Sequence, residues 1–469
     1  MKKRFTNFFV LLSFFSIQLH AQTILSNNQQ LEAAYRLAVN TVKFNTHDSI
    51  LAAGADYGGE WVRDISINIW NGVSFFSPEV AKKSLWSVTV DNRQKAGHQY
   101  WDRILWVHGA YNYFLVSQDN AFLKAAYTCG LNTMNELEAT AFDADYGMFT
   151  GPSVFNDGIA GYDEPIYDPV KAGDGYVLNH RADRIKCLST NCAYYMAYQD
   201  LNQMHRLLNN GKNNALFLEK AAKLRVAIRK NLYDSPNDKL NYLVDQNGKV
   251  HAFQEALGIS YAIRGGVVTK EEGLRITQKC VKAKFGIPSI SPSFSRFSDE
   301  KPGRHNRTIW PFVNASYAIA ALETGNIHDF DFEFFNLMSL ALDKDKGNTN
   351  FWEVYHPNTG HVDGGWQAGG PFVSCSNQTW SATGFLSMVY FGIAGLHVCP
   401  EKVSIAPYLP KGVNNLELNG LQIGQMVLNL KISGQGNQIK EFKVNGEAKS
   451  VFELNTNLKG TQVVEIKLG

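Results

Sequence analysis

The sequence predicts a mainly α-helical protein in which paired helices close into a barrel, followed by a small antiparallel β domain. Between about residues 28 and 394, apolar residues recur at helical spacing and are separated by loops rich in Gly, Asp and Asn. Several of these segments are apolar almost all round, which is typical of an inner ring of helices covered by an outer one. Beyond residue 398, short stretches alternate apolar and polar residues, which is the pattern of strands.

The helical segments follow one another along the chain. Residues 30–42 place Leu31, Ala34 and Leu37 on one face of a helix. Pro78, which follows a serine, favours the start of the next helix, because proline fits the first helical position. Roughly a dozen helices are expected in all. Further helices are predicted over residues 101–117, 120–139, 190–208, 213–232, 270–282, 311–324, 329–342 and 379–391.

Two long irregular stretches interrupt the helices, at residues 141–183 and 347–377. Loops of this length are uncommon in a compact domain unless they have a function. We expect them to cover one end of the barrel.

The strand-like segments near the end of the chain span residues 416–420, 426–432 and 442–447. They hold few aromatic residues and no acidic cluster, so a packing role is favoured over catalysis. The sequence therefore predicts three parts: a signal peptide over residues 1–21, a helical catalytic domain over residues 22–398 and a β domain over residues 399–469.

The first residues of the chain have the pattern of an export signal. Lys2, Lys3 and Arg4 precede an apolar stretch over residues 8–17, and Ala21 ends a plausible cleavage site. The apolar stretch is short for a membrane span. We therefore expect a periplasmic or secreted protein, without a membrane span once the signal is removed.

Composition argues against several function classes. The net charge is +2, with Lys and Arg scattered among Asp and Glu, so there is no basic stripe for nucleic acid. The six cysteines show no zinc-like spacing, and buried thiols are favoured over a pair between Cys187 and Cys192. His356 and His361 do not share a helical face, which favours hydrogen-bonding roles over a metal site. No cofactor is expected, because no nucleotide-binding loop is present.

Five segments combine acidic and aromatic residues, as a carbohydrate site requires. Cleavage of a glycosidic bond needs one carboxylic acid, one carboxylate and aromatic rings that stack on sugar faces. Six of the nine tryptophans lie in or just after these segments. One of them, Trp380, stands near the start of an apolar helix and is equally suited to the core. The segments are residues 56–64 (DYGGEWVRD), 99–103 (QYWDR), 156–165 (NDGIAGYDEP), 307–314 (RTIWPFVN) and 351–360 (FWEVYHPNTG).

The order of these motifs resembles the six-hairpin glycosidases. The resemblance rests on residues 61–64 (WVRD), on Trp310-Pro311 with Asn314, on residues 352–360 (WEVYHPNTG) and on residues 379–382 (TWSA). The pattern is similar to glycoside hydrolase family 63 and its mannosylglycerate-hydrolase-like relatives, and more distantly to the rhamnosidases of family 78. It covers residues 61–395 and implies an (α/α)6 barrel that hydrolyses an α-linked sugar of an oligo- or polysaccharide.

The resemblance implies that Glu353 is the general base. In those relatives the general acid is an Asp in a Gly-x-Asp-x-Ser-Pro segment, and residues 161–165 (GYDEP) are similar without the Ser. Asp163 is therefore the first candidate, with Asp157 and Glu164 as rivals in the same loop. We expect an inverting, exo-acting enzyme with carboxyl groups roughly 6.5–9.5 Å apart.

Other residues of the motifs are candidates for binding sugar. Arg63 beside Asp64 can donate and accept hydrogen bonds, although a buried ion pair that braces the barrel is the alternative. Asp102 can add an acceptor or pair with Arg103 at a helix end. The tryptophans expected to line the subsites are Trp61, Trp101, Trp310, Trp352 and Trp366.

Helical barrels also carry other reactions on carbohydrate. A polysaccharide lyase, an unsaturated-uronide hydrolase or a sugar epimerase is the alternative within enzymes. A lyase or uronide hydrolase needs a basic subsite, which arginines such as Arg63, Arg181, Arg184 and Arg304 can supply. A non-catalytic carbohydrate-binding protein is the alternative from another class.

Overall fold

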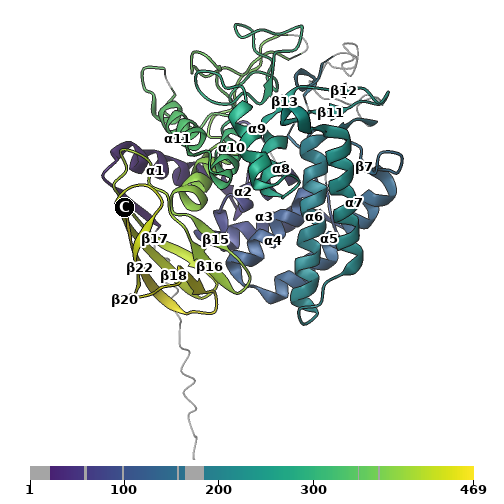
Figure 1. Cartoon of the computed structure of the whole chain (residues 1–469). Coiled ribbons are helices and arrows are strands. Elements are labelled where there is room, and N and C mark those ends of the chain that lie inside the picture. Colours follow the sequence, from purple (N-terminus) through teal and green to yellow (C-terminus); the bar gives the residue numbers. More distant parts are fainter. Residues whose placement is uncertain are drawn as a thin grey trace, which may run out of the picture.

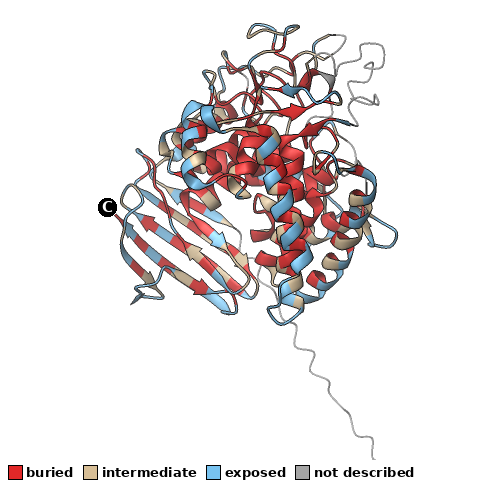
Figure 2. Ribbon diagram, turned by 45° about the vertical axis from the view of Figure 1, so that its right-hand side comes forward, coloured by how far each residue is buried: buried red, intermediate tan, exposed pale blue. Residues whose placement is uncertain are grey.

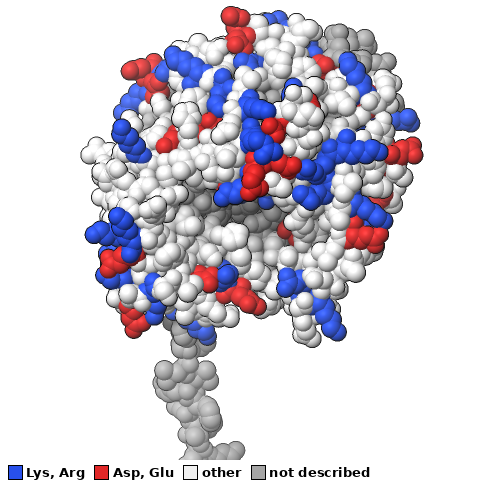
Figure 3. Space-filling model, in the orientation of Figure 1, with Lys and Arg blue, Asp and Glu red and all other residues white. Residues whose placement is uncertain are grey.

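The helices form one body and a β-sheet domain lies against one side of it (Figure 1). The structure, a computed structural model, describes residues 22–57, 61–97, 100–155, 158–163, 184–346, 348–367 and 370–469. The predicted signal peptide lies outside these ranges. Within them no helix has the length and apolar character that a membrane span requires. Positive and negative side chains are interspersed over the face shown in Figure 3.

Six helices form a closed inner ring. Each one contacts the next along the chain, and the last contacts the first. The ring consists of α2 (Val62–Trp70), α4 (Leu105–Ser117), α6 (Leu188–Leu208), α8 (Ala256–Arg264), α10 (Pro311–Thr324) and α12 (Thr379–Ser387), which continues as a π-helical turn (Met388–Ile393).

Six further helices cover the ring from outside, so that twelve α-helices lie in the described part of the chain. Outer and inner helices alternate in the sequence, which is consistent with the predicted (α/α)6 barrel. The contacts of α3 with α4, α5 with α6 and α11 with α10 show how the layers pack. The outer helices are α1 (Gln29–Phe44), α3 (Pro78–Ser87), α5 (Asn120–Ala141), α7 (Ala215–Leu232), α9 (Lys270–Lys279) and α11 (Ile327–Leu342).

The inner helices are buried on nearly all sides (Figure 2). In α10, all residues from Pro311 to Ala321 are buried, because the ring occupies one side of the helix and the outer layer the other. Pro311 stands at the first position of this helix, and Gly325, with a φ of 95°, ends it. The outer helices bury one face only, as α1 does through Leu31, Ala34 and Ala38.

The connections differ at the two ends of the barrel. An outer helix joins the next inner helix through a long segment at the N-terminal end of the ring, whereas the return connections, such as residues 118–119 and 325–326, are short. The predicted long loops both belong to the first kind, so the parts of them that the structure describes connect at the N-terminal end of the ring. Short strands in these segments are β2 (Thr46–His47), β3 (Ile50–Leu51), β4 (Thr89–Val90), β5 (Lys95–Ala96), β6 (Phe142–Asp143), β7 (Met148–Phe149), β8 (Lys186–Cys187), β9 (Tyr233–Asp234), β10 (Lys239–Leu240), β11 (Leu243–Val244), β12 (Val250–His251), β13 (Gln254–Glu255) and β14 (Ile290–Ser291).

The β domain contains a six-stranded sheet and a three-stranded one. Strand β1, at the start of the described chain, is the edge of the larger sheet and pairs with β17. In order across the larger sheet the strands are β1 (Thr23–Ser26), β17 (Asn415–Ile423), β18 (Met426–Ser433), β22 (Gly460–Leu468), β19 (Ile439–Val444) and β20 (Glu447–Ala448); the smaller sheet has β15 (Leu396–Val398), β16 (Lys402–Ile405) and β21 (Glu453–Asn455).

The prediction of an antiparallel sheet is wrong for one pair of strands. Strand β22 runs parallel to β18, with Met426 opposite Gly460, while the other pairs in this sheet are antiparallel. The chain leaves β18, forms β19 to β21 and returns between β18 and β19. Alternating apolar and polar residues do not distinguish the two directions, because side chains alternate in both. The predicted boundary at residue 399 stays a prediction.

All six cysteines are free thiols, including Cys187 and Cys192, which are buried. The preference for buried thiols over a disulfide between these two is therefore confirmed.

Replacing Gly109 with Ala tests the close approach of α2 and α4. A Cβ atom at this position would lie 2.8 Å from Ser66 Cα, which is closer than packed atoms come. Alanine normally stabilises a helix relative to glycine by about 0.5–1 kcal/mol. Here we expect G109A to lower the free energy of unfolding by about 1–3 kcal/mol, because the helices must separate. Chemical denaturation measures the change.

The matched control is Gly370→Ala, since a Cβ atom there meets nothing within 4 Å. It should change stability by less than about 0.5 kcal/mol. A G109A protein as stable as its parent would contradict the close packing of these two helices.

Candidate active site

A small cavity of about 100 Å³ lies at the N-terminal end of the inner ring. Trp61 and Trp310 are the N-cap residues that directly precede α2 and α10, and Glu353 comes from the segment between α11 and α12. The cavity brings together five of the predicted site residues: Trp61, Arg63, Asp64, Trp310 and Glu353.

Glu353 is a buried carboxylate, with 2% of its surface exposed. Arg304 Nη2 donates to Oε1 over 2.5 Å, and the hydroxyl of Tyr57 donates to Oε2 over 2.8 Å. The backbone N–H of Cys375 lies 3.4 Å from the same Oε2. A buried charge requires such partners, because burial without them is costly. The carboxylate is therefore held in one orientation at the wall of the cavity.

Tyr57 links the two charged groups. Arg304 Nη2 also donates to the Tyr57 hydroxyl oxygen over 2.6 Å, so Arg304, Tyr57 and Glu353 form a closed triangle of hydrogen bonds. Burial raises the pKa of Tyr57, and the negative charge of Glu353 raises it further, against the smaller opposite effect of Arg304. The phenol therefore stays protonated and acts as a donor to the carboxylate. The guanidinium of Arg304 lies 3.7 Å from the ring of Phe372.

Arg63 forms a buried ion pair at the cavity. Its Nη1 donates to Asp102 Oδ2 over 3.0 Å, and its Nε lies 3.9 Å from Asp64 Oδ2. Asp102 is fully buried and does not line the cavity, so this ion pair braces α2 against the segment before α4. Arg63 and Asp64 line the cavity as well.

The predicted tryptophans are divided between the cavity and its surroundings. Trp310 lines the cavity, but the ring of His305 stacks on it at 5.0 Å and Trp380 meets it edge-on. Trp101, Trp352 and Trp366 do not line the cavity; Trp101 is buried. Trp366 is covered by Lys301, whose Nζ lies 4.0 Å from the ring centre.

Several lining residues were not predicted as part of the site. Tyr57 and Gln378 had no assigned role, and Arg304 was considered only as part of a basic subsite for an acidic sugar. Tyr57 was close to a recognised signal, because it belongs to the segment at residues 56–64. The lining residues outside the prediction are Ala53, Tyr57, Arg304, His305, Gln378 and Trp380.

Asp163, the first candidate for the acid, contacts a buried histidine. Its Oδ1 lies 2.7 Å from His251 Nδ1, and His251 Nε2 lies 3.2 Å from Asp245 Oδ2. Burial lowers the pKa of His251, but the two carboxylates outweigh this effect and raise it. Asp163 and His251 therefore form a hydrogen-bonded pair. The rivals Asp157 and Glu164 lie outside the described residues.

Glu255 is a third buried carboxyl group near the same end of the ring, at the start of α8. Burial raises its pKa to about 7, against the lowering effect of hydrogen bonds from Ser153 and Ser189. That pKa suits a general acid. However, Glu255 is fully buried and its oxygens accept from these two serines, so it is placed to brace the segment before α6 rather than to reach a substrate.

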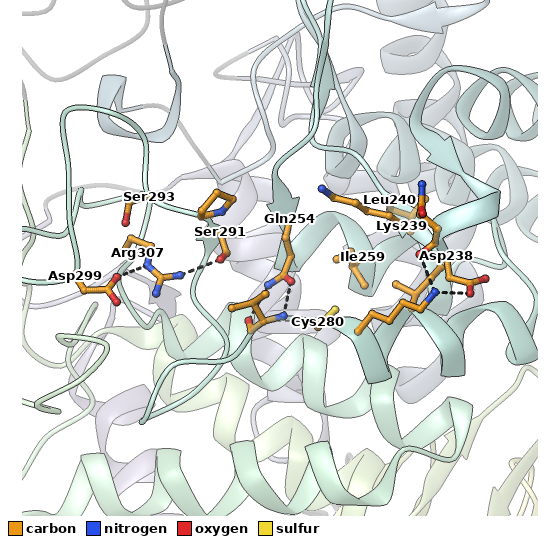
Figure 4. A pocket seen from close by; sticks show the side chains of 15 residues that line it. Asp238, Lys239, Leu240, Gln254, Ile259, Cys280, Ser291, Ser293, Asp299 and Arg307 are labelled. Atoms are coloured by element: carbon orange, nitrogen blue, oxygen red, sulfur yellow. Dashed lines mark hydrogen bonds and ion pairs between the residues drawn. The ribbon is translucent and has the colours of Figure 1, made fainter.

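A larger cavity of about 710 Å³ lies between α9, the β9–β10 hairpin and the segment around β14 (Figure 4). Its polar groups include an arginine that is already paired, since Arg307 donates to Asp299 over 2.7 Å and to Ser291 over 3.0 Å. The remaining wall includes apolar side chains such as Ile259 and Ile276. Because its wall contains no buried carboxylate like that of Glu353, we place the chemistry in the smaller cavity.

Metal chemistry finds no support among the described residues. They contain no group of three or more His, Cys, Asp or Glu side chains that is placed to hold an ion. His356, weighed above as a metal ligand, accepts through Nδ1 from the backbone N–H groups of Asn358 and Thr359, both over 3.2 Å.

Comparison with known proteins identifies the family. Residues 74–381 match the family described as the mannosylglycerate hydrolase MGH1-like glycoside hydrolase domain. The chain belongs to this family of glycoside hydrolases. It is therefore a glycosidase that acts on carbohydrate. A comparison with curated proteins gives no significant match.

Solved structures share the fold of this glycosidase at low sequence identity. A mannosylglycerate hydrolase of family 63 from Thermus thermophilus is 14% identical, with a TM-score of 0.59 over 76% of this chain and 100% of that one. A family 78 rhamnosidase from a Bacillus species is 14% identical, with a TM-score of 0.61 over 95% of this chain. A sialidase is 13% identical, with a TM-score of 0.68 over 91% of this chain. The glycosidase spans only 44% of the rhamnosidase chain and 40% of the sialidase chain.

Replacing Tyr57 with Phe tests the triangle around Glu353. The change removes one donor from a buried carboxylate and one acceptor from Arg304. Loss of such a hydrogen bond costs about 1–3 kcal/mol, so kcat/KM should fall by about one to two orders of magnitude. Steady-state kinetics on any glycoside that the parent hydrolyses measures it. Tyr127→Phe, which removes a hydroxyl near His205, is the matched control and should keep full activity.

The raised pKa of His251 predicts a pH effect. A histidine whose pKa is raised on folding stabilises the native state fully below its unfolded pKa, and this contribution is lost as the pH rises through the folded pKa. An NMR titration should therefore place the midpoint of His251 above 6.5. Asp245→Asn should move it downward, because one of the two negative partners is removed. A midpoint below 6.5 in the parent would contradict the arrangement.

Proposed function

We propose that this glycosidase is an exported, inverting and exo-acting enzyme that removes an α-linked sugar from an oligo- or polysaccharide. Glu353 is the general base, and the general acid lies in the loop from Asp157 to Glu164, with Asp163 as the first candidate. The observation that carries the proposal is the buried Glu353 carboxylate, which is fixed by Arg304 and Tyr57 at the wall of a cavity.

In the proposed reaction, Glu353 removes a proton from water while the water oxygen bonds to the anomeric carbon. The bond from that carbon to the leaving oxygen breaks, and the acid gives the leaving oxygen its proton. Water between the base and the sugar requires the two carboxyl groups to be roughly 6.5–9.5 Å apart. The products are one free sugar of inverted configuration and one shortened alcohol.

The role of each element supports these assignments. Asp163 and Glu353 come from the two long segments at the same end of the ring, between α5 and α6 and between α11 and α12. His251 lies within hydrogen-bond distance of Asp163 and is placed to pass a proton to it. Arg63 and Asp64, at the start of α2, supply a donor and an acceptor for sugar hydroxyls at the cavity wall.

The substrate class is inferred more indirectly. A cavity of about 100 Å³ favours one terminal sugar over the middle of a chain, which supports exo action. The α linkage follows from the resemblance of the motifs to families 63 and 78. The basic and apolar start of the chain supports export to the periplasm or to the outside of the cell.

Replacing Glu353 with Gln tests the base. Without the carboxylate, turnover of every accepted glycoside should fall by on the order of 10²–10⁴-fold or more. The melting temperature should also fall, because Arg304 loses its buried anionic partner, and a cooperative transition shows that the variant is still folded. NMR of the first product formed by the parent shows its anomer, and inversion is expected. Near-normal hydrolysis by E353Q would disprove the assignment, and a retained anomer would disprove the inverting mechanism.

The same assay identifies the acid. Asp163→Asn, Asp157→Asn and Glu164→Gln are compared on substrates with poor and good leaving groups. The variant without its acid should lose activity on the poor leaving group and keep much of it on the good one, because only the first needs a proton.

An acidic sugar is the second candidate substrate. Arg63 and Arg304 both line the cavity, and a guanidinium can bind a carboxylate. However, Arg63 already pairs with Asp102, and Arg304 already pairs with Glu353.

A product that absorbs ultraviolet light would indicate a lyase, whereas binding without any product would indicate a non-catalytic sugar-binding protein.

A further inference from the structure

A second large cavity opens at the opposite end of the barrel from Glu353. Its volume is about 610 Å³, within the range of roughly 300–1,000 Å³ of small-molecule sites. It lies where α2, α8 and α10 end, at Trp70, Arg264 and close to Glu323, and strand β15 of the sheet domain forms one side. The surface in Figure 3 is hollowed between the sheet domain and the helices. No described residue lines both this cavity and the one at Glu353.

Arg264 lines this cavity and is incompletely paired there. Its side chain is 12% exposed, and its guanidinium lies 4.3 Å from the ring centre of Trp70. The carboxylate of Glu323 is 3.6 Å from Nε, beyond hydrogen-bond distance. Nε is buried and has no hydrogen-bond partner among the described residues. A nearly buried guanidinium in this state is costly unless a bound molecule accepts from it.

Two more polar groups face the same space. His108 Nδ1 lies 2.6 Å from Asp200 Oδ2, while the buried Nε2 has no hydrogen-bond partner in the described part of the chain. Tyr111 also belongs to the wall, and burial raises its pKa, so it stays a phenol that can both donate and accept. His108 and Tyr111 come from α4, Asp200 comes from α6 and Arg264 from α8, so three inner helices supply polar groups to the wall.

The charges around the cavity select a neutral ligand. Asp200 and Glu323 are acidic and Arg264 is basic, and the C-terminal ends of helices carry a partial negative charge that disfavours anions. The rest of the wall includes aromatic surface such as Trp70 and Phe391. Donors, acceptors and aromatic surface without net positive charge match the hydroxyls and C–H faces of a sugar.

We propose that this cavity is a second, non-catalytic binding site for a mono- or disaccharide, held by Arg264, Asp200 and Tyr111. The ligand is recognised as a neutral polyhydroxylated molecule, and no chemistry takes place there. The site does not depend on Glu353, so it can exist whether or not the proposed hydrolysis is correct.

Binding in an inactive background tests the site. D-glucose, D-mannose and L-rhamnose are titrated into E353Q by calorimetry, and into E353Q combined with Arg264→Met or Tyr111→Phe. At least one sugar should bind E353Q, and R264M should weaken that binding by about tenfold or more, because a charged donor is lost. Y111F, which removes only a hydroxyl, should weaken it less. A crystal structure of E353Q with the sugar should show it between Arg264 and Asp200.

Arg36→Met is the matched control, because Arg36 is an exposed arginine of α1 that pairs with Glu32 and does not line the cavity. It should leave binding unchanged. Melting temperatures without sugar show whether each variant is folded, and Y111F serves if R264M is not. Three results would overturn the proposal. They are equal binding by E353Q with and without R264M and Y111F, no binding of any of the three sugars, and a crystal in which the cavity holds only water. Binding that E353Q keeps and that R264M weakens in the same background separates this site from the catalytic one, because Arg264 does not line the cavity at Glu353.

Discussion

The inner ring imposes the constraint on which the rest of the structure depends. Helices such as α4 and α10 are apolar around most of their circumference, so no single face can be left to water. Their surfaces are buried only if the ring closes and a second layer covers it. Because the inner helices run parallel, all of their N-terminal ends meet at one end of the barrel and their C-terminal ends at the other.

The two ends consequently differ in chemistry. The long segments at the N-terminal end bring buried charges together in specific pairs: Glu353 has Arg304, and Arg63 has Asp102. Such pairing is expensive to break because the ions are removed from water. The same pairing gives a precise orientation to the groups that face the substrate. At the other end the short connections leave a wider space, whose wall includes the incompletely paired Arg264.

The sequence predicted most helices because a period of 3.6 residues is a local signal. It missed α2 and α8 as separate elements, since each has only nine residues, too few for the helical period to stand out from its surroundings. The parallel pairing of β18 and β22 was missed for a different reason, because alternation carries no information on direction. The candidate site was predicted only as far as its motifs reached. Glu353 was recognised through its surrounding sequence, whereas its partners Tyr57 and Arg304 come from distant segments that nothing local connects.

Strand β1 has a consequence for how the molecule is assembled. This edge strand pairs with β17, with Ile24 opposite Leu418. The strand at the beginning of the described chain is thus held by a strand near its end. Contacts of such sequence separation are slow to form, because a long loop must close first. The barrel can thus collapse while the β domain still lacks an edge strand, and an open sheet edge is prone to pair with other chains. Completion of this sheet is a step at which aggregation competes with folding.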